Sequence, residues 1–312
     1  MSGTPATHRT LGGVSVPGDA TQAPVVRARS LVRRYGNVTA LAGIDVDVAP
    51  GEAVGIIGPN GAGKTTFLDL VSGLLRPSSG WIEVTGSTPG SPPAVRALGR
   101  MFEDPVTFAH LKPRRIAQAL GMHGEARQTF DRLVDELRVP HRRSGSFSKG
   151  ELTRLGLAVA MAPRPTLLAL DEPTSGLDPE TAETVELMVR GYTSEGSTAV
   201  LVATHRIEDL RVMTDRTILF DRGRILQDVP TTEFLEMAVR VEVQAADEDM
   251  LSRLLGDLPY RLIPSRDGTV EIMSADPRLV AERLETVPTL RVSVRPSLAS
   301  ALRRVRFRSD LG

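Results

Sequence analysis

Gly58-Pro59-Asn60-Gly61-Ala62-Gly63-Lys64-Thr65-Thr66 decides the fold, because this stretch fits the phosphate-loop pattern G-x-x-x-x-G-K-[ST] at every position. The apolar run Ala53–Ile57 before it predicts a buried strand, and Phe67–Leu75 after it predicts a helix. In that setting the backbone N–H groups of a Gly-rich turn curl around phosphate oxygens, and the helix N-terminus adds partial positive charge. Lys64 can then reach the β- and γ-phosphates, and the Thr65 hydroxyl can ligate Mg²⁺. The alternative, a chance match in a Gly-rich turn, does not explain the strand, the lysine and the helix together.

A second apolar run ends in two adjacent carboxylates. Leu167-Leu168-Ala169-Leu170 is followed directly by Asp171 and Glu172, and similar short runs recur at 199–203 and 217–220 between helical patterns. This alternation predicts an α/β fold with a parallel sheet covered on both faces. Ligands bind at the carboxyl edge of such sheets, so Asp171 is expected to hold Mg²⁺ and Glu172 to act as general base toward an attacking water. Taken alone, an Asp-Glu pair after a strand is more often a solvated turn.

The composition narrows the class of protein. The chain has 312 residues, of which 41% are hydrophobic, which is enough for one large domain and a smaller one. Its 38 basic and 38 acidic residues balance, so no nucleic-acid partner is expected. The absence of cysteine excludes disulfides, thiolate catalysis and zinc–thiolate sites. No apolar run reaches the roughly 18 residues of a membrane helix, and no signal-peptide pattern is present, so a cytoplasmic protein is expected.

Changes in composition and periodicity divide the chain. Residues 1–24 are rich in Gly, Pro, Thr, Ser and Ala without apolar periodicity, and are predicted to be a disordered leader. Residues 25–237 are predicted to form the main domain. Within it, Pro50-Gly51 is expected to turn the strand Ile44–Val48 back into Ala53–Ile57.

The last part of the chain, residues 238–312, is predicted to be a small α+β domain. Strand and helix patterns follow there in the order β-α-β-β-α-β, which is the order of a ferredoxin-like domain. A further helix over Ser297–Val305 is expected to pack back.

Four motifs occur in a fixed order along the chain: the phosphate loop, Phe147-Ser148-Lys149-Gly150-Glu151, Asp171-Glu172-Pro173-Thr174-Ser175-Gly176-Leu177-Asp178, and Thr204-His205. This order resembles the nucleotide-binding subunit of an ATP-binding cassette (ABC) transporter over roughly Val25–Val229. The run ending at Asp178 and followed by His205 is highly specific, because other phosphate-loop ATPases lack the combination. The resemblance implies a P-loop NTPase fold of ABC type: a parallel core sheet, an antiparallel β subdomain and a helical subdomain at about 104–162. It also implies ATP and Mg²⁺ as cofactors.

The resemblance also assigns roles to matching positions. It implies that two copies of the chain enclose two ATP molecules head to tail, so that Ser148 and Gly150 contact the ATP held by the opposite copy. Asp178 would lie in the loop that couples the two sites, and Tyr35 would stack on adenine. His205 would contact the γ-phosphate, which makes it a catalytic residue beside Glu172 and Lys64. A partly buried surface tyrosine is the alternative for Tyr35.

Two segments depart from the family pattern. The signature usually reads Leu-Ser-Gly-Gly-Gln, whereas Lys149 and Glu151 here place a cation and an anion beside the retained Ser148 and Gly150. The position of the family's glutamine, which ligates Mg²⁺, is occupied by Glu103, whose carboxylate can also offer oxygen to a hard cation. Both departures resemble the drug-exporter branch. The alternative for Glu103 is a solvated loop acid.

These observations favour the ATP-hydrolysing subunit of an exporter for a drug-like, antibiotic or lipid-like compound. It is expected to lie on the cytoplasmic face of the plasma membrane, attached to a separately encoded membrane subunit. An importer ATPase is the first alternative. A soluble ABC ATPase acting on ribosomes or DNA would show two cassettes or long insertions, and neither is present. A catalytically dead module is disfavoured because Lys64, Asp171, Glu172 and His205 are all retained.

Overall fold

The computed structural model describes residues 23–103, 110–194, 196, 198–244, 248–264, 269–274, 276–287 and 290–311. Nearly all of the leader predicted over 1–24 lies outside these ranges, as do the first residues of the predicted helical subdomain.

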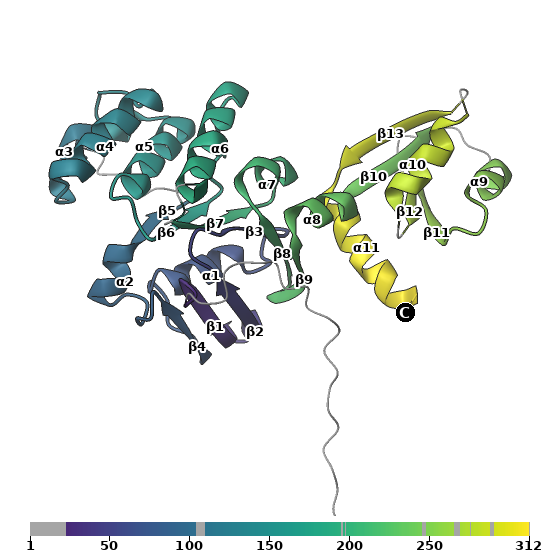
Figure 1. Ribbon diagram of the computed structural model, residues 1–312, viewed down its shortest axis with the longest axis horizontal. Helices are drawn as coiled ribbons and strands as arrows, with labels where there is room; N and C mark the ends of the chain where they lie inside the picture. Colours follow the sequence, from purple (N-terminus) through teal and green to yellow (C-terminus); the bar gives the residue numbers. More distant parts are fainter. Residues whose placement is uncertain are drawn as a thin grey trace, which may run out of the picture.

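Two sheets form the larger part of the molecule (Figure 1). One is antiparallel, with strand order β2-β1-β4. The other has the order β5-β6-β7-β3-β8-β9 and is parallel except for its last strand. The strands are β1 (Val26–Tyr35), β2 (Val38–Val48), β3 (Ala53–Ile57), β4 (Ser79–Val84), β5 (Leu98–Met101), β6 (Leu167–Asp171), β7 (Ala199–Thr204), β8 (Arg216–Asp221) and β9 (Arg224–Pro230). The α/β fold predicted from the sequence, with its antiparallel subdomain, is confirmed.

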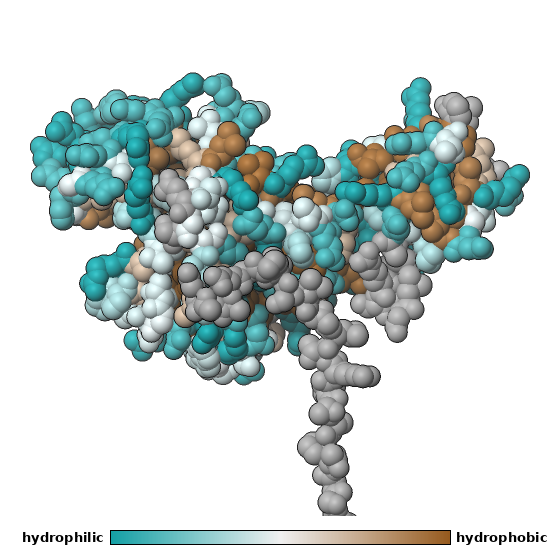
Figure 2. Space-filling model, viewed as in Figure 1, coloured by the Kyte–Doolittle hydropathy of each residue, from teal (hydrophilic) through white to brown (hydrophobic). Residues whose placement is uncertain are grey.

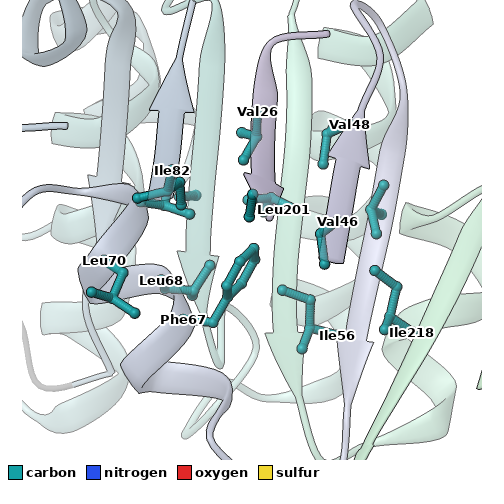
Figure 3. Packing of buried hydrophobic residues seen from close by; sticks show 14 of the residues in the cluster. Val26, Val46, Val48, Ile56, Phe67, Leu68, Leu70, Ile82, Leu201 and Ile218 are labelled. Carbon is teal, nitrogen blue, oxygen red and sulfur yellow. The ribbon is translucent and has the colours of Figure 1, made fainter. Parts of the chain in front are cut away.

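Helices cover both faces of the parallel sheet. They are α1 (Lys64–Val71), α2 (Pro92–Ala97), α3 (Pro113–Ala119), α4 (Gly124–Glu136), α5 (Lys149–Met161), α6 (Pro179–Ser194), α7 (Ile207–Met213) and α8 (Thr231–Met237), with a 3₁₀ turn at Ser144–Ser146. Helix α1 lies between the two sheets, where Phe67 and Leu68 pack with strand residues such as Ile56 (Figure 3). A second core, formed mainly with α4 and α5, covers the opposite face of the parallel sheet. The parallel sheet therefore has a hydrophobic core on each face, and α1 lies in the core that faces the antiparallel sheet.

The predicted return of β2 into β3 is wrong. The Pro50-Gly51 turn is present, with the Glu52 N–H donating to the Ala49 carbonyl, but the two strands belong to different sheets. β2 pairs with β1, whereas β3 lies between β7 and β8. All five residues of β3 are buried, and a strand that is apolar on both faces fits the centre of a covered parallel sheet rather than a hairpin.

The C-terminal part has its own sheet, with strand order β11-β12-β10-β13 and every neighbouring pair antiparallel. Its elements are β10 (Val239–Gln244), α9 (Glu248–Leu255), β11 (Tyr260–Pro264), β12 (Thr269–Ser274), α10 (Pro277–Glu285) and β13 (Arg291–Pro296). The two strands of each β-α-β unit are separated by a third strand, which is the split βαβ arrangement of ferredoxin-like sheets. Apolar residues of β10, β12, α9 and α10 form its core. The viewed face of the molecule is mainly hydrophilic, with hydrophobic residues showing over this part (Figure 2).

Helix α11 (Leu298–Leu311) joins the two parts of the molecule. Its Ala301 and Val305 share a hydrophobic cluster with residues of α7 and α8. Its Arg304 is fully buried and donates hydrogen bonds to the carbonyls of Ser274, Met237 and Val239. One guanidinium therefore ties the end of α8, the start of β10 and the end of β12 together.

Candidate active site

The phosphate loop connects the end of β3 to the start of α1, as predicted. Its glycines are required by close packing as well as by backbone conformation. A Cβ on Gly58 would lie 2.3 Å from the Phe220 carbonyl oxygen, and one on Gly63 would lie 2.7 Å from that of Ala40. Gly63 also has φ +108°, a conformation that residues with side chains rarely adopt, and it precedes the first residue of the helix. The loop is therefore pressed against β8 and β2.

Lys64 is buried at the first position of α1. Its Nζ donates to the Gly58 carbonyl oxygen at 2.7 Å and to that of Pro59 at 3.3 Å. Burial lowers the pKa of Lys64 from its ordinary value, against the opposing pull of the carboxylates of Glu172 and Asp171. The ammonium is thus held inside the loop, near two consecutive acids at the end of β6, where it can meet phosphate.

Asp171 ends β6 with a buried carboxylate. Burial raises the pKa of Asp171 above its ordinary value, although the Arg100 guanidinium and a hydrogen bond with Thr65 oppose that rise. No group of three or more His, Cys, Asp or Glu side chains that could hold a metal is present in the described ranges. Magnesium in nucleotide sites commonly takes one or two carboxylates plus phosphate and water oxygens. The buried Asp171 carboxylate beside the Thr65 hydroxyl fits that pattern.

Glu172 and His205 meet at the same edge of the sheet. Glu172 Oε1 lies 2.8 Å from His205 Nδ1, and the Thr204 hydroxyl is 3.4 Å from Oε2. Glu172 has φ +50°, a backbone conformation that is costly for a residue with a side chain and is maintained here by the surrounding fold. Its N–H donates to the Ala203 carbonyl at 2.8 Å. The carboxylate is buried, whereas His205 is half-exposed toward solvent.

Asp209 is a member of this site that sequence reasoning missed. It is fully buried in α7 and accepts hydrogen bonds from Thr174 at 2.8 Å and Thr204 at 2.6 Å. Thr174 follows Glu172 closely in the chain, and Thr204 precedes His205. Asp209 therefore fixes the two segments that bring the acid and the histidine together. The only sequence signal was an acidic residue a few positions after His205.

The signature segment opens helix α5. Ser148 is the N-cap residue: its side chain accepts from the Glu151 N–H at 3.3 Å, and Glu151 Oε2 accepts from the Ser148 N–H at 2.7 Å. This reciprocal capping box accounts for the unusual glutamate. Arg142 pairs with Glu151 at 2.8 Å, which balances its charge. A Cβ on Gly150 would lie 2.4 Å from the Gly176 carbonyl oxygen, so this position has no room for a side chain.

Lys149 and Glu103, one from each segment that departs from the family pattern, face each other. Lys149 Nζ lies 3.6 Å from Glu103 Oε1, with both side chains about half-exposed. The pair links the end of the β5 segment to the start of α5. Such an exposed ion pair contributes at most about 1 kcal/mol.

The remaining predicted residues lie apart from this cluster. Within the described part of the chain, no hydrogen bond or ion pair joins Tyr35, Ser148 or Asp178 to the phosphate loop. Asp178 caps α6, accepting from the Thr181 N–H at 3.0 Å and its hydroxyl at 2.7 Å. These hydrogen bonds lower the pKa of Asp178 below its ordinary value. Tyr35 is exposed at the end of β1, with the Arg33 guanidinium 4.5 Å from its ring centroid.

None of the helices in the described ranges combines the length and apolar character needed to cross a lipid bilayer.

Comparisons with known proteins identify the family. The ABC transporter family model matches residues 41–175. The chain is 32% identical over 259 residues to an uncharacterized ABC transporter ATP-binding protein, YdbJ of Bacillus subtilis. The matched region covers 80% of this chain and 83% of the relative. This chain belongs to the ABC transporter ATP-binding proteins. It is an ABC ATPase, the ATP-hydrolysing subunit of a transporter, and the resemblance found in its sequence is confirmed.

Two further relatives and two solved structures extend the comparison. The methionine import ATP-binding protein MetN of Mesorhizobium japonicum is 32% identical, covering 83% of this chain and 74% of the relative. The bacitracin transport ATP-binding protein BcrA of Bacillus licheniformis is 28% identical, covering 66% and 70%. An ATP-binding subunit of an ABC transporter superposes with a TM-score of 0.62 at 25% identity, covering 67% of this chain and 91% of that one. A dimeric post-hydrolysis cassette bound to ADP and Pi shares the fold, with a TM-score of 0.60 at 22% identity, covering 66% and 98%.

Proposed function

We propose that this ABC ATPase powers export of a drug-like, antibiotic or lipid-like compound through a separately encoded membrane subunit. The observation that carries the catalytic part of the proposal is the Glu172–His205 contact, which places a buried carboxylate and an accessible imidazole at the carboxyl edge of the sheet beside Lys64. The export direction rests on the Ser148-Lys149-Gly150 signature and Glu103, which resemble the drug-exporter branch, and is supported by the similarity to a bacitracin transport ATPase.

The residues divide the work of hydrolysis between them. The phosphate loop and Lys64 bind the phosphates, since loop N–H groups and the buried ammonium supply positive charge there. Thr65 and Asp171 would hold Mg²⁺, which supplies charge neutralisation at the β- and γ-phosphates when bound, and Glu103 is a further oxygen donor. Glu172 accepts a proton from the attacking water as general base, and His205 orients that carboxylate and reaches toward the γ-phosphate.

Two copies of the chain are proposed to act together. Ser148 is exposed and Gly150 is buried at the start of α5, where helix N–H groups favour an anion, and no hydrogen bond or ion pair joins them to their own phosphate loop in the described residues. A second copy placed head to tail brings its ATP to this helix start. Asp178 follows the loop that packs against Gly150, and Tyr35, which is exposed at the end of β1, would stack on adenine.

The test combines turnover with identification of the partner. Glu172→Gln keeps the size and shape of the side chain but removes its charge and basicity. It should bind ATP normally and lose turnover roughly 10²–10⁴-fold. Glu136→Gln makes the same change on an exposed helix face and should turn over ATP normally. Unchanged turnover in Glu172→Gln would assign the base elsewhere.

The same variant identifies the partner. Tagged Glu172→Gln protein purified with MgATP from detergent-solubilised native membranes should retain a polytopic membrane protein in stoichiometric amount. Ribosomal proteins or nucleic acid in its place would overturn the transporter reading.

Import is the second candidate, because a methionine import ATPase is 32% identical to this chain. The two directions differ in a growth experiment. If this ATPase powers export, deleting its gene should make cells more sensitive to drug-like compounds. If it powers import, the deletion should abolish uptake of a nutrient.

A further inference from the structure

Arg100 is a buried cation directly behind the candidate magnesium ligand. It lies in β5, whose register pairs Arg100 with Ala169 of the neighbouring β6. Its Nη2 is 3.4 Å from Asp171 Oδ2 and 3.4 Å from Asp69 Oδ1 of α1. The Arg100 side chain is 6% exposed and that of Asp171 is 2% exposed. The guanidinium therefore bridges the strand that carries Asp171 and the helix that follows the phosphate loop.

The burial of this pair makes it different from a surface ion pair. Exposed pairs contribute little, but removing one member of a buried pair leaves an uncompensated charge. Arg100 is further fixed by hydrogen bonds to the carbonyls of Met101 and Ala169, and its guanidinium lies 4.6 Å from the Phe102 ring centroid. Its Nε has no hydrogen-bond partner among the described residues. Packing alone does not require a buried arginine here, because an apolar side chain would fill the same position in a short strand.

One nitrogen of Arg100 joins two carboxylates from different elements. Its Nη2 contacts Oδ2 of Asp171 and Oδ1 of Asp69, while Thr65, at the start of α1, also hydrogen-bonds with the Asp171 carboxylate. The other terminal nitrogen, Nη1, donates to the carbonyls of Met101 and Ala169. The planar guanidinium is therefore fixed in orientation, and it supplies orientation as well as charge to Asp171.

We propose that Arg100 is a positioning residue for metal-dependent nucleotide binding: through its contact with Oδ2 it holds the Asp171 carboxylate in a fixed orientation beside Thr65. The proposal rests on the proposed role of Asp171 in holding Mg²⁺. Partners that orient a metal ligand change metal affinity roughly 10–100-fold when removed. Neither the phosphate-loop pattern nor the Asp-Glu pair contains Arg100, which stands three residues before Glu103.

The test measures metal dependence separately from nucleotide binding. Binding of a non-hydrolysable fluorescent ATP analogue to the full-length protein is titrated in EDTA and then against Mg²⁺. Arg100→Met should leave binding in EDTA unchanged and raise the half-saturating Mg²⁺ concentration roughly 10–100-fold. Arg100→Lys should recover part of the loss, because a lysine restores charge without the fork.

Two further variants keep the outcome decisive if Arg100→Met folds poorly. Asp69→Asn weakens the second contact of the same Arg100 Nη2 and should shift the Mg²⁺ requirement in the same direction. Arg216→Met removes another largely buried arginine, which pairs with Glu52 and Asp228, and should lower stability without changing the Mg²⁺ requirement.

The results test the role of Arg100 and the Mg²⁺ assignment separately. If wild-type binding depends on Mg²⁺ and both Arg100→Met and Asp69→Asn keep the wild-type requirement, Arg100 has no positioning role. If wild-type binding does not depend on Mg²⁺, the metal assignment itself is overturned. An equal shift in Arg216→Met would reduce the effect to general destabilisation, which also contradicts the proposal.

Discussion

Replacing Gly150 by alanine should destabilise the cassette even though it places a better helix former inside a helix. Gly150 is the second residue of α5, and its Cα faces the carbonyl of Gly176 in the loop before α6. A Cβ there would lie 2.4 Å from that oxygen, whereas ordinary contacts begin near 3.4 Å. Relief requires a shift of about 1 Å in backbone, since the atom that is met is not the end of a flexible side chain.

The magnitude follows from two opposing terms. Alanine in place of glycine stabilises a helix by about 1 kcal/mol. Overpacking typically costs about 1–3 kcal/mol, and a backbone obstacle places this site at the upper end. The net expectation is a loss of about 2 kcal/mol, or a fall in Tm of about 4–8 °C for a domain of this size.

Gly191 provides the matched control. It is also a helical glycine, in α6, but a Cβ there would meet nothing within 4 Å. Gly191→Ala should therefore gain about 0.4–1 kcal/mol. Thermal and denaturant unfolding of both variants, with ATP binding and ATPase turnover, give the comparison. Because Gly150 lies at the proposed contact with the opposite ATP, turnover of Gly150→Ala should fall while ATP binding persists.

The two positions differ in the room available for a new Cβ, so the stabilities of the two variants should change in opposite directions. If Gly150→Ala were as stable as Gly191→Ala, the close approach to Gly176 would not constrain the signature segment, and the steric argument would be refuted.

Two other perturbations concern the C-terminal part. Arg304→Met should lower the free energy of unfolding by roughly 3 kcal/mol or more, because three carbonyls lose a buried donor. The C-terminal part should then be cleaved faster by protease while ATP binding is retained. Unchanged proteolysis would contradict this prediction. Burial alone would raise the pKa of Glu271, but hydrogen bonds from Arg303 and Ser300 hold that pKa below its ordinary value. The stabilisation is therefore present above the unfolded-state pKa of about 4.3 and is lost as pH falls through the lower folded-state value. Glu271→Gln should flatten acid unfolding below about pH 4, and superimposable acid curves would show that Glu271 is not responsible.

The sequence predicted those parts of the candidate site that lie within short contiguous stretches. The phosphate loop and the buried strand that ends at Asp171, directly before Glu172, occur where their local patterns placed them, whereas α5 begins at Lys149, with Ser148 as its N-cap. Glycines, caps and apolar runs act through bonds and turns a few residues long, so their chemistry is encoded in short stretches. The same locality explains why Glu151 could be mistaken for a charge near phosphate when it is a capping residue.

The errors and omissions share one cause. The apolar pattern of β3 does not indicate its neighbours, so the sequence predicts a return of the chain at Pro50-Gly51 but not that β3 joins the parallel sheet. Helices α7 and α8 are only seven residues each, too short for periodicity to show them.

The sequence by itself determined that this is a phosphate-loop ATPase of ABC type, and it predicted the phosphate loop and Glu172 as the candidate general base. Only the tertiary structure decided that Arg100 stands behind Asp171, that Asp209 joins the segments of Glu172 and His205, and that Gly150 meets Gly176. These contacts depend on strand order and register between distant segments. A one-dimensional pattern carries the preferences of each segment, whereas the partner of each side chain is chosen by how the segments pack.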